Sequence, residues 1–338
     1  MRRSLSFFLA GAALLLAAAG PAGKPPSARA PWQPVEIREW TVPWESSRPR
    51  DPYVAPDSRI WFVGQRSDYV AVLDPENDEF RRYELESGTG PHNLIVGEDG
   101  AVWYAGNLSS HIGRLDPATG EIVRYPMPNP EARDPHTLAF DGQGGIWFTV
   151  QGGNFVGHLD TVSGDVRLVA VPTSRARPYG IVVDEWDRPW VALFGTHKLA
   201  TVNPLSFALR EIPLPRERAR PRRIARTSDG AVWYVDFAEG YLGRYDPVGG
   251  TFREWPTPAG KESRPYALAA DDHDRLWFVE TGPRPNRFVG FDPVSEEFFS
   301  LTEIASGGGS VRHMVFDPHR RTIWFGTDTN TVGRASIP

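Results

Sequence analysis

The amino-acid sequence predicts an all-β fold: a seven-bladed β-propeller with four antiparallel strands per blade. The first observation is a short pattern, an aliphatic residue followed by Trp and usually an aromatic residue, as in Ile146-Trp147-Phe148. Six such copies and a weaker one, Pro189-Trp190-Val191, occur at Trp-to-Trp steps of 42, 44, 43, 43, 44 and 47 residues. This period is typical of propeller blades. The second observation is that no stretch after residue 23 has a sustained helical period. The tryptophans are Trp61, Trp103, Trp147, Trp190, Trp233, Trp277 and Trp324.

The third unit shows how each repeat divides into strands. Residues 135–140 and 146–150 are predicted as its first two strands, joined by a Gly-rich hairpin turn. Residues 155–160 and 166–171 are predicted as the third and fourth strands. We expect the tryptophan of each unit to pack between neighbouring blades and not to contact a ligand.

The two ends of the repeat region complement each other. The last unit has predicted strands at about 311–316, 322–327 and 331–336, and no fourth strand follows. The missing fourth-strand pattern occurs before the first unit, in residues 37–43. The N-terminal strand is therefore predicted to complete the last blade and close the ring, which removes two exposed sheet edges.

The N-terminal residues are predicted not to belong to the fold. Arg2 and Arg3 precede an uncharged, mostly apolar run and then small residues, so residues 1–23 are predicted to be a secretory signal peptide. Residues 24–34 form a Pro-rich leader, and residues 35–338 form a single propeller domain. Because the chain contains no Cys, disulfides and thiolate metal sites are excluded. We expect a bacterial periplasmic or secreted protein without a membrane anchor after signal cleavage.

Charge and composition narrow the class of partner. Removing Arg2 and Arg3 changes the formal net charge from −5 to −7, and no basic stripe is present. Nucleic acid is therefore not an expected partner. We expect a monomer that binds a small molecule at the mouth of its central channel.

Candidate site residues follow from counting along each unit. The residue after the proline that opens each first strand should project at one rim of the channel. Six of these positions lie 11 residues before the tryptophan, and in the first unit Arg50 or Tyr53 takes the place. The six are His92, His136, Tyr179, Arg222, Tyr266 and His313. The second strands run back to the same rim and reach it three residues after the tryptophan. Two of the residues at this position are acidic, Asp236 and Glu280. Converging polar groups in a concavity predict a ligand site, and a water-filled polar channel is the alternative.

Three motifs recur along the chain: Pro-[His/Tyr], Asp-Gly-x-[Leu/Val/Ile]-Trp-[Phe/Tyr] and the Ile-Gly-Arg-Leu-Asp-Pro of residues 112–117. Together they resemble the motifs of the virginiamycin B lyase, or streptogramin lyase, family. The resemblance covers about residues 35–338. It implies a seven-bladed propeller that opens a cyclic depsipeptide by elimination, using a Glu, two His and a magnesium ion. Glu280 matches the family Glu and would hold the metal. Tyr266 and Arg222 stand where the family has its two His, so two of three catalytic positions are changed.

These substitutions leave several interpretations open. The candidate catalytic residues are Glu280, Tyr266 and Arg222, and the candidate ligand-binding residues are His92, His136, Tyr179, Asp236 and His313. A neighbouring Arg lowers the pKa of a Tyr and suits it to acid–base work, whereas an ion pair of Arg222 with Asp236 or Glu280 would be structural. Three channel His residues also suggest a divalent-metal site.

Three functions are consistent with the sequence. The first is a lyase that acts on a cyclic ester or a similar small molecule. The second is a non-catalytic propeller that binds a ligand or a protein. The third is a gluconolactonase-like lactonase, which needs more acidic ligands around the channel.

Overall fold

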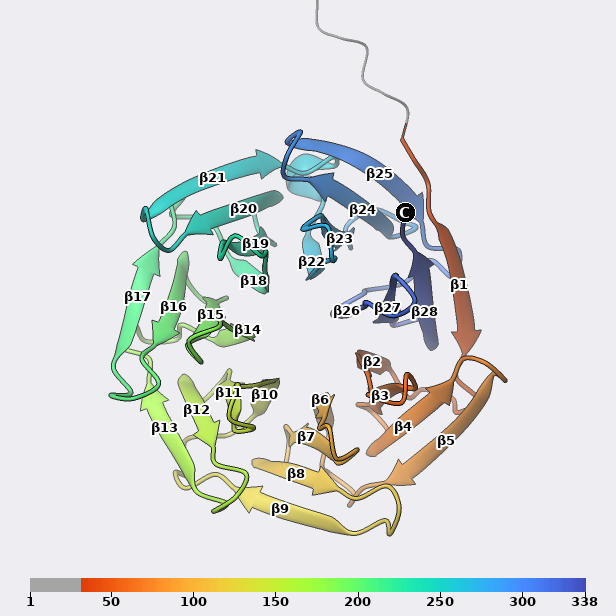
Figure 1. The fold of residues 1–338 in the computed structure, drawn as a ribbon, viewed down its shortest axis with the longest axis vertical. Coiled ribbons are helices and arrows are strands. Elements are labelled where there is room, and N and C mark those ends of the chain that lie inside the picture. Colours follow the sequence, from red (N-terminus) through yellow and green to blue (C-terminus); the bar gives the residue numbers. More distant parts are fainter. Residues whose placement is uncertain (1–31) are drawn as a thin grey trace, which may run out of the picture. The chain divides into compact units, whose positions relative to one another are not determined.

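The computed structural model describes residues 32–338. The predicted signal peptide, residues 1–23, and residues 24–31 of the leader lie outside the described residues. The described part consists of seven four-stranded antiparallel sheets. Figure 1 shows them around a common centre, with the first strand of each sheet innermost and the fourth strand at the periphery. The predicted propeller and its blade number are confirmed.

Each blade uses four strands that follow one another in the chain, except the last. The first strands are β2 (Pro49–Val54), β6 (Pro91–Val96), β10 (Pro135–Phe140), β14 (Pro178–Val183), β18 (Pro221–Arg226), β22 (Pro265–Ala270) and β26 (Met314–Asp317). The second strands are β3 (Ile60–Gly64), β7 (Val102–Gly106), β11 (Ile146–Val150), β15 (Pro189–Leu193), β19 (Val232–Asp236), β23 (Leu276–Glu280) and β27 (Thr322–Gly326).

The outer strands follow the same order. The third strands are β4 (Tyr69–Asp74), β8 (His111–Leu115), β12 (Phe155–Leu159), β16 (Lys198–Val202), β20 (Tyr241–Asp246), β24 (Arg287–Asp292) and β28 (Thr331–Ser336). The fourth strands are β5 (Glu79–Glu84), β9 (Ile122–Pro126), β13 (Val166–Ala170), β17 (Leu209–Pro213), β21 (Thr251–Pro256), β25 (Glu297–Glu303) and β1 (Glu36–Thr41). A 3-10 turn, η1 (Gly260–Glu262), lies between β21 and β22. Within residues 32–338 no helix is long and apolar enough to span a bilayer.

The ring is closed by the N-terminal strand, as predicted. β1 pairs antiparallel with β28 over its whole length, from Glu36 opposite Ser336 to Thr41 opposite Thr331. The last sheet therefore has the order β1-β28-β27-β26. Figure 1 shows β1 on the outer side of β28. The edges at which β1 and β28 meet are therefore both hydrogen-bonded.

The repeated tryptophans pack between blades. All seven are at most 5% exposed. Each belongs to an apolar cluster shared with the following blade; Trp103, for example, contacts the cluster that contains Ile146 and Phe148. Trp324 of the last blade packs with Ile60 and Phe62 of the first. A buried aromatic side chain contributes a large apolar area to packing. The repeated tryptophans are therefore scaffold residues that hold neighbouring blades together.

The closing strand offers the first testable prediction. Trp40 on β1 stacks on Trp324 with ring centroids 5.3 Å apart, and its Nε1 donates to Asp78 Oδ1 at 2.6 Å. Replacing Trp40 by Ala should lower the free energy of unfolding by about 3–5 kcal/mol, because a large cavity opens at the closure. Urea unfolding measures this change. Trp186→Ala, at a 59% exposed position, is the control and should change stability by about 0.5 kcal/mol or less; equal losses in the two variants would contradict the role of Trp40.

Candidate functional site

A β-bulge at the start of the first strand turns two consecutive side chains of most blades toward the channel. In β10, Pro135 pairs with Val150 and Leu138 pairs with Phe148, so two residues on this strand oppose one on the other. The same shift occurs in β2, β6, β14, β18 and β22. A bulge re-aims a side chain that strict alternation would place on the other face.

The channel residues therefore form two layers. The rim layer lies where the first strands begin, and it consists of Arg50, His92, His136, Tyr179, Arg222, Tyr266 and Arg312. The inner layer is one residue further along each strand, and it consists of Asp51, Asn93, Thr137, Gly180, Arg223, Ala267 and His313.

The last blade departs from the count of 11 residues. Val315 pairs with Trp324, whereas in the other blades the residue opposite the tryptophan lies eight before it, as Ile95 does for Trp103. The hairpin between β26 and β27 is thus one residue longer. The predicted rim position of His313 is wrong for this reason: Arg312 occupies the rim layer, and His313 belongs to the inner layer. In the first blade, Tyr53 pairs with Trp61, so Arg50 is the rim residue.

Aromatic rings run side by side along part of the rim layer. The rings of His92 and His136 have centroids 3.5 Å apart, and those of His136 and Tyr179 are 4.0 Å apart. His92 Nδ1 lies 3.2 Å from the carbonyl oxygen of His136, and His136 Nδ1 lies 2.8 Å from Thr137 Oγ1. Burial, and then nearby cationic side chains, hold the pKa of both imidazoles well below the usual value. Both are neutral at pH 7.

Two buried tyrosines meet beneath Arg222. The hydroxyls of Tyr179 and Tyr266 share a short hydrogen bond, and their side chains are 3% and 1% exposed. The Arg222 guanidinium lies 3.6 Å from the ring centroid of Tyr266 and 5.1 Å from that of Tyr179. Phe194 and Phe237, from the turns after β15 and β19, complete an aromatic box around this cation.

The two tyrosines ionise differently. Burial opposes ionisation of Tyr179, but the guanidiniums of Arg222, Arg50 and Arg223 outweigh it and lower its pKa to about 8. Burial, and then the negative charge that Tyr179 acquires, raise the pKa of Tyr266. Since the pKa of one tyrosine is lowered and that of the other is raised, the pair is suited to share one proton between two oxygens above about pH 8, once Tyr179 has ionised.

This difference predicts a resolved step in an ultraviolet titration. One of the ten tyrosines should ionise near pH 8 in the native protein, because its pKa is lowered from 10.0 to about 8, and the step should vanish in Tyr179→Phe. Because the native pKa lies below that of the unfolded chain, unfolding takes up a proton between these values, and stability should rise with pH from about 8 to 10. Tyr83→Phe, on outer strand β5, is the control and should retain the step. A wild-type titration with no ionisation below pH 9 would contradict the assignment.

The inner layer closes the channel with a charged network. Asp51 Oδ2 accepts from Arg223 Nη2 at 2.8 Å and from Asn93 Nδ2 at 3.1 Å, and Arg50 Nε donates to Asp51 Oδ1 at 3.0 Å. Arg223 also donates to Thr137 Oγ1 and to the carbonyl oxygen of Arg312. These bonds cross the channel from β18 to β2 and β10. Burial would raise the pKa of Asp51, but Arg50 and Arg223 outweigh it and hold that pKa far below its usual range.

The two second-strand acids do not join either layer. Asp236 pairs with Arg216 Nη2 at 2.9 Å and accepts from the backbone N–H of Arg220 at 2.8 Å. Glu280 accepts from the N–H of Ala259 at 2.8 Å. Burial raises the pKa of both carboxyl groups.

These partners overturn one of the expected interpretations. Asp236 and Glu280 bond to the loops that precede β18 and β22, and Arg287 lies 3.9 Å from Glu280. Within residues 32–338, no salt bridge joins Arg222 to either acid, so the predicted ion pair of Arg222 is wrong. The physical reason is that Asp236 and Glu280, the last residues of β19 and β23, accept hydrogen bonds from loop N–H groups.

The donor set does not fit the magnesium ion that the sequence resemblance implies. Glu280 Oε2 is buried without a hydrogen-bond partner, but the only charged group close to it in the described chain is the cationic Arg287. The family's His positions hold Arg222 and Tyr266, and a guanidinium cannot bind a cation. No three His, Cys, Asp or Glu side chains in the described part are placed to hold a metal. The suggested three-histidine site is therefore not formed.

Asp51, Asn93 and Arg223, which hold the site together, were not predicted from the sequence. Each directly follows a predicted rim position in the chain. A sequence signal was present. Of the seven residues that directly follow a rim position, three are charged or carry an amide. The bulge that exposes them to the channel has no distinct sequence pattern here.

Comparisons with known proteins agree with this architecture. Residues 35–335 match the model of the virginiamycin B lyase family. The crystal structure of virginiamycin B lyase from Staphylococcus aureus superposes with a TM-score of 0.81 at 22% identity, covering 90% of this chain and 99% of that one. A catalytically inactive variant of the same enzyme with quinupristin gives 0.80 at 22% identity, covering 90% and 99%.

More distant chains share only the fold. A chain of Kuenenia stuttgartiensis hydrazine synthase gives a TM-score of 0.72 at 14% identity, covering 88% of this chain and 97% of that one. A search of curated proteins found no match. Since the family model covers nearly the whole described chain, and the structure has the seven blades that the motifs predict, this protein belongs to the virginiamycin B lyase family.

Proposed function

We propose that this protein is an exported lyase-type propeller that binds a small carboxylate-bearing molecule at the rim of its channel and acts on it by elimination. The observation that carries the proposal is Arg222. Its guanidinium is half-buried in the channel and lies over the hydrogen-bonded tyrosine pair. No carboxylate of residues 32–338 pairs with it.

An unpaired guanidinium in a confined site favours an anionic ligand. Removing a charge from water is costly unless a partner compensates it. The rim also carries Arg50 and Arg312, and the acid nearest this surface, Asp328, is shared between Arg312 and Arg48. Phe194 and Phe237 offer flat apolar faces beside the cation. A carboxylate attached to a ring or to an apolar group complements this combination.

The tyrosine pair supplies the acid–base chemistry. With the carboxylate on Arg222, the ionised oxygen of Tyr179 would take the proton from the carbon next to the carbonyl. The electron pair forms a carbon–carbon double bond, and the carbon–oxygen bond at the next carbon breaks. The departing oxygen is protonated from the Tyr266 side of the pair. A cyclic ester or an ether oxygen in this position serves as leaving group. An anion that draws Arg222 off the face of Tyr266 uncovers the two hydroxyls.

A non-catalytic binding propeller is the second candidate, and the burial of the tyrosines favours it. With 3% and 1% exposure, neither hydroxyl is open to a ligand unless Arg222 moves. If Arg222 stays in its aromatic box with ligand bound, the site binds without turnover.

Binding and turnover are tested together in the purified protein. Calorimetry with an oligo-uronate, which carries carboxylates, measures affinity, and the absorbance of the new conjugated double bond measures turnover. A streptogramin B depsipeptide, whose carboxyl terminus is closed into the ring ester, tests for the reaction of the family. Arg222→Gln should weaken binding of the carboxylate by about tenfold or more, since a hydrogen bond to a charged group contributes about 1.5–3 kcal/mol. Arg81→Gln is the matched control, because Arg81 lies over the exposed-strand Tyr83 ring at 4.6 Å.

The outcomes separate the candidates. Binding and turnover that both depend on Arg222 support the lyase. Binding without a new double bond supports the binding propeller. Carboxylate binding that is unchanged in Arg222→Gln refutes both. Cleavage of the depsipeptide that appears only in an Arg222→His/Tyr266→His variant would show that the native reaction differs from that of the family.

A further inference from the structure

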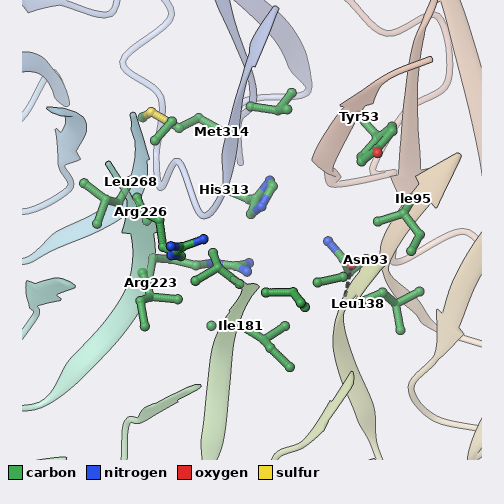
Figure 2. Close-up of a pocket in the computed structure, with 18 of the residues that line it drawn as sticks. Tyr53, Asn93, Ile95, Leu138, Ile181, Arg223, Arg226, Leu268, His313 and Met314 are labelled. Atoms are coloured by element: carbon green, nitrogen blue, oxygen red, sulfur yellow. Dashed lines mark hydrogen bonds between the residues drawn. The ribbon is translucent and has the colours of Figure 1, made fainter. Parts of the chain in front are cut away.

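A cavity lies on the other side of the inner layer from Arg222. It has a volume of about 420 Å³ and is lined by residues of all seven first strands. The inner layer forms its floor, because the bonds from Arg223 to Asp51 and Thr137 cross the channel. These bonded side chains lie between the cavity and the rim layer. Figure 2 shows Asn93, Arg223 and His313 from different strands around this space.

The walls of this distal cavity are aliphatic. The residues directly beyond the inner layer are 1–6% exposed and apolar in six blades. They are Leu94, Leu138, Ile181, Ile224, Leu268 and Met314. Half-buried apolar side chains, among them Phe140, Ala270 and Phe316, form the mouth. An apolar concavity of this kind gains free energy when an apolar ligand replaces the water in it.

The charged network beneath the cavity has a net positive charge. Arg223 of the floor shares the single carboxylate of Asp51 with Arg50 of the rim layer. At the mouth, Arg226 is paired with Glu185 and adds no net charge. His313 lines the cavity, and its Nδ1 is buried without a hydrogen-bond partner. When the proton of the neutral imidazole is on Nδ1, this nitrogen is a free N–H donor beside the positively charged network.

We infer that the distal cavity is a second ligand site, which takes a small apolar molecule that ends in a carboxylate. The apolar body lies against Leu138, Ile181 and Leu268, and the carboxylate accepts a hydrogen bond from His313 near Arg223. Burial, and then the charge of Arg223, lower the pKa of His313 to about 3, so the imidazole is neutral and the unmatched charge comes from the arginines. This site is independent of the proposed elimination at the rim.

Decanoate is the probe that tests this site. Calorimetry with the purified protein should show one decanoate bound, and Ala270→Trp should weaken the binding at least about tenfold by filling the mouth. Val123→Trp, at a 39% exposed position on outer strand β9, is the matched control and should bind decanoate like the wild type. Circular dichroism verifies that both variants are folded.

The His313→Leu variant tests the contact to the ligand carboxylate separately from the contacts to its apolar body. This variant should bind decanoate about tenfold more weakly and bind neutral decanol as the wild type does. Absence of decanoate binding, or equal binding in Ala270→Trp and wild type, would overturn the inference. Binding that is lost in Arg222→Gln but kept in His313→Leu would place the decanoate at the rim, and would also refute the distal site.

Discussion

Asp51→Asn should be the most destabilising single substitution in the channel, with a loss of about 3–5 kcal/mol in the free energy of unfolding. Asp51 is fully buried and accepts hydrogen bonds from Arg50, Arg223 and Asn93. Removing its charge leaves two buried guanidiniums without a counter-ion. Asn is chosen because Asp51 has a φ of 49°, a conformation that Asn tolerates better than most residues. Urea unfolding at pH 7 measures the loss.

An exposed ion pair provides the matched control. Arg82 pairs with Glu84, whose side chain is 60% exposed, and Glu84→Gln should cost at most about 1 kcal/mol. The pH dependence is a second check. Since the pKa of Asp51 is lowered in the folded state, its contribution is present above the unfolded pKa of about 4 and is lost as the pH falls toward the folded value. An Asp51→Asn variant as stable as Glu84→Gln would show that the network does not hold the channel closed.

Tyr179→Phe should reduce turnover by about 100- to 10,000-fold if the rim carries out an elimination, because this is the usual contribution of a positioned general base. Binding should change little, since the proposed anion partner is Arg222. The measurement is the rate of double-bond formation with whichever carboxylate the wild-type protein converts. In the wild type, the rate should rise with pH to a plateau above the pKa of about 8 that Tyr179 has in the structure.

The loss of the hydroxyl must be separated from damage to the fold. Tyr179→Phe leaves the Tyr266 hydroxyl buried without its partner, which costs about 1–3 kcal/mol. The double variant Tyr179→Phe/Tyr266→Phe removes both polar groups and should be closer to wild-type stability while still inactive. A stable double variant with wild-type turnover would exclude the tyrosine pair from the chemistry.

The fold was predictable because the signals for it are local and repeated. A Trp buried in every blade interface is visible as a constant step of residues, and β1 was recognisable as a fourth strand separated from its blade. Strand ends in the last blade were less accurate: residues 311–313 were predicted as strand, but β26 begins at Met314. Backbone pairing starts three residues later than predicted, with Met314 opposite Phe325.

The site was predictable only in part, since it depends on where side chains point. Counting back from the tryptophan found Tyr179, Arg222 and Tyr266, because the interval between them is fixed by pairing in their blades. Counting did not find Asp51 or Arg223, because the β-bulge turns one more side chain toward the channel than the strict alternation of a strand predicts. The second-strand acids, Asp236 and Glu280, were assigned to the channel by position alone, and loop N–H groups hold them elsewhere.

The pairing of β1 with β28 also sets an order of events during synthesis. Six blades consist of consecutive residues and can form as soon as each has been made. The seventh needs Glu36–Thr41 and Thr331–Ser336 together, so its first-made strand has to wait until the rest of the chain is complete. Such long-range pairing is slow because loop closure must precede the contact energy. The waiting segment carries Trp40, which is 6% exposed in the closed ring, so a large apolar side chain stays in water until β1 pairs with β28.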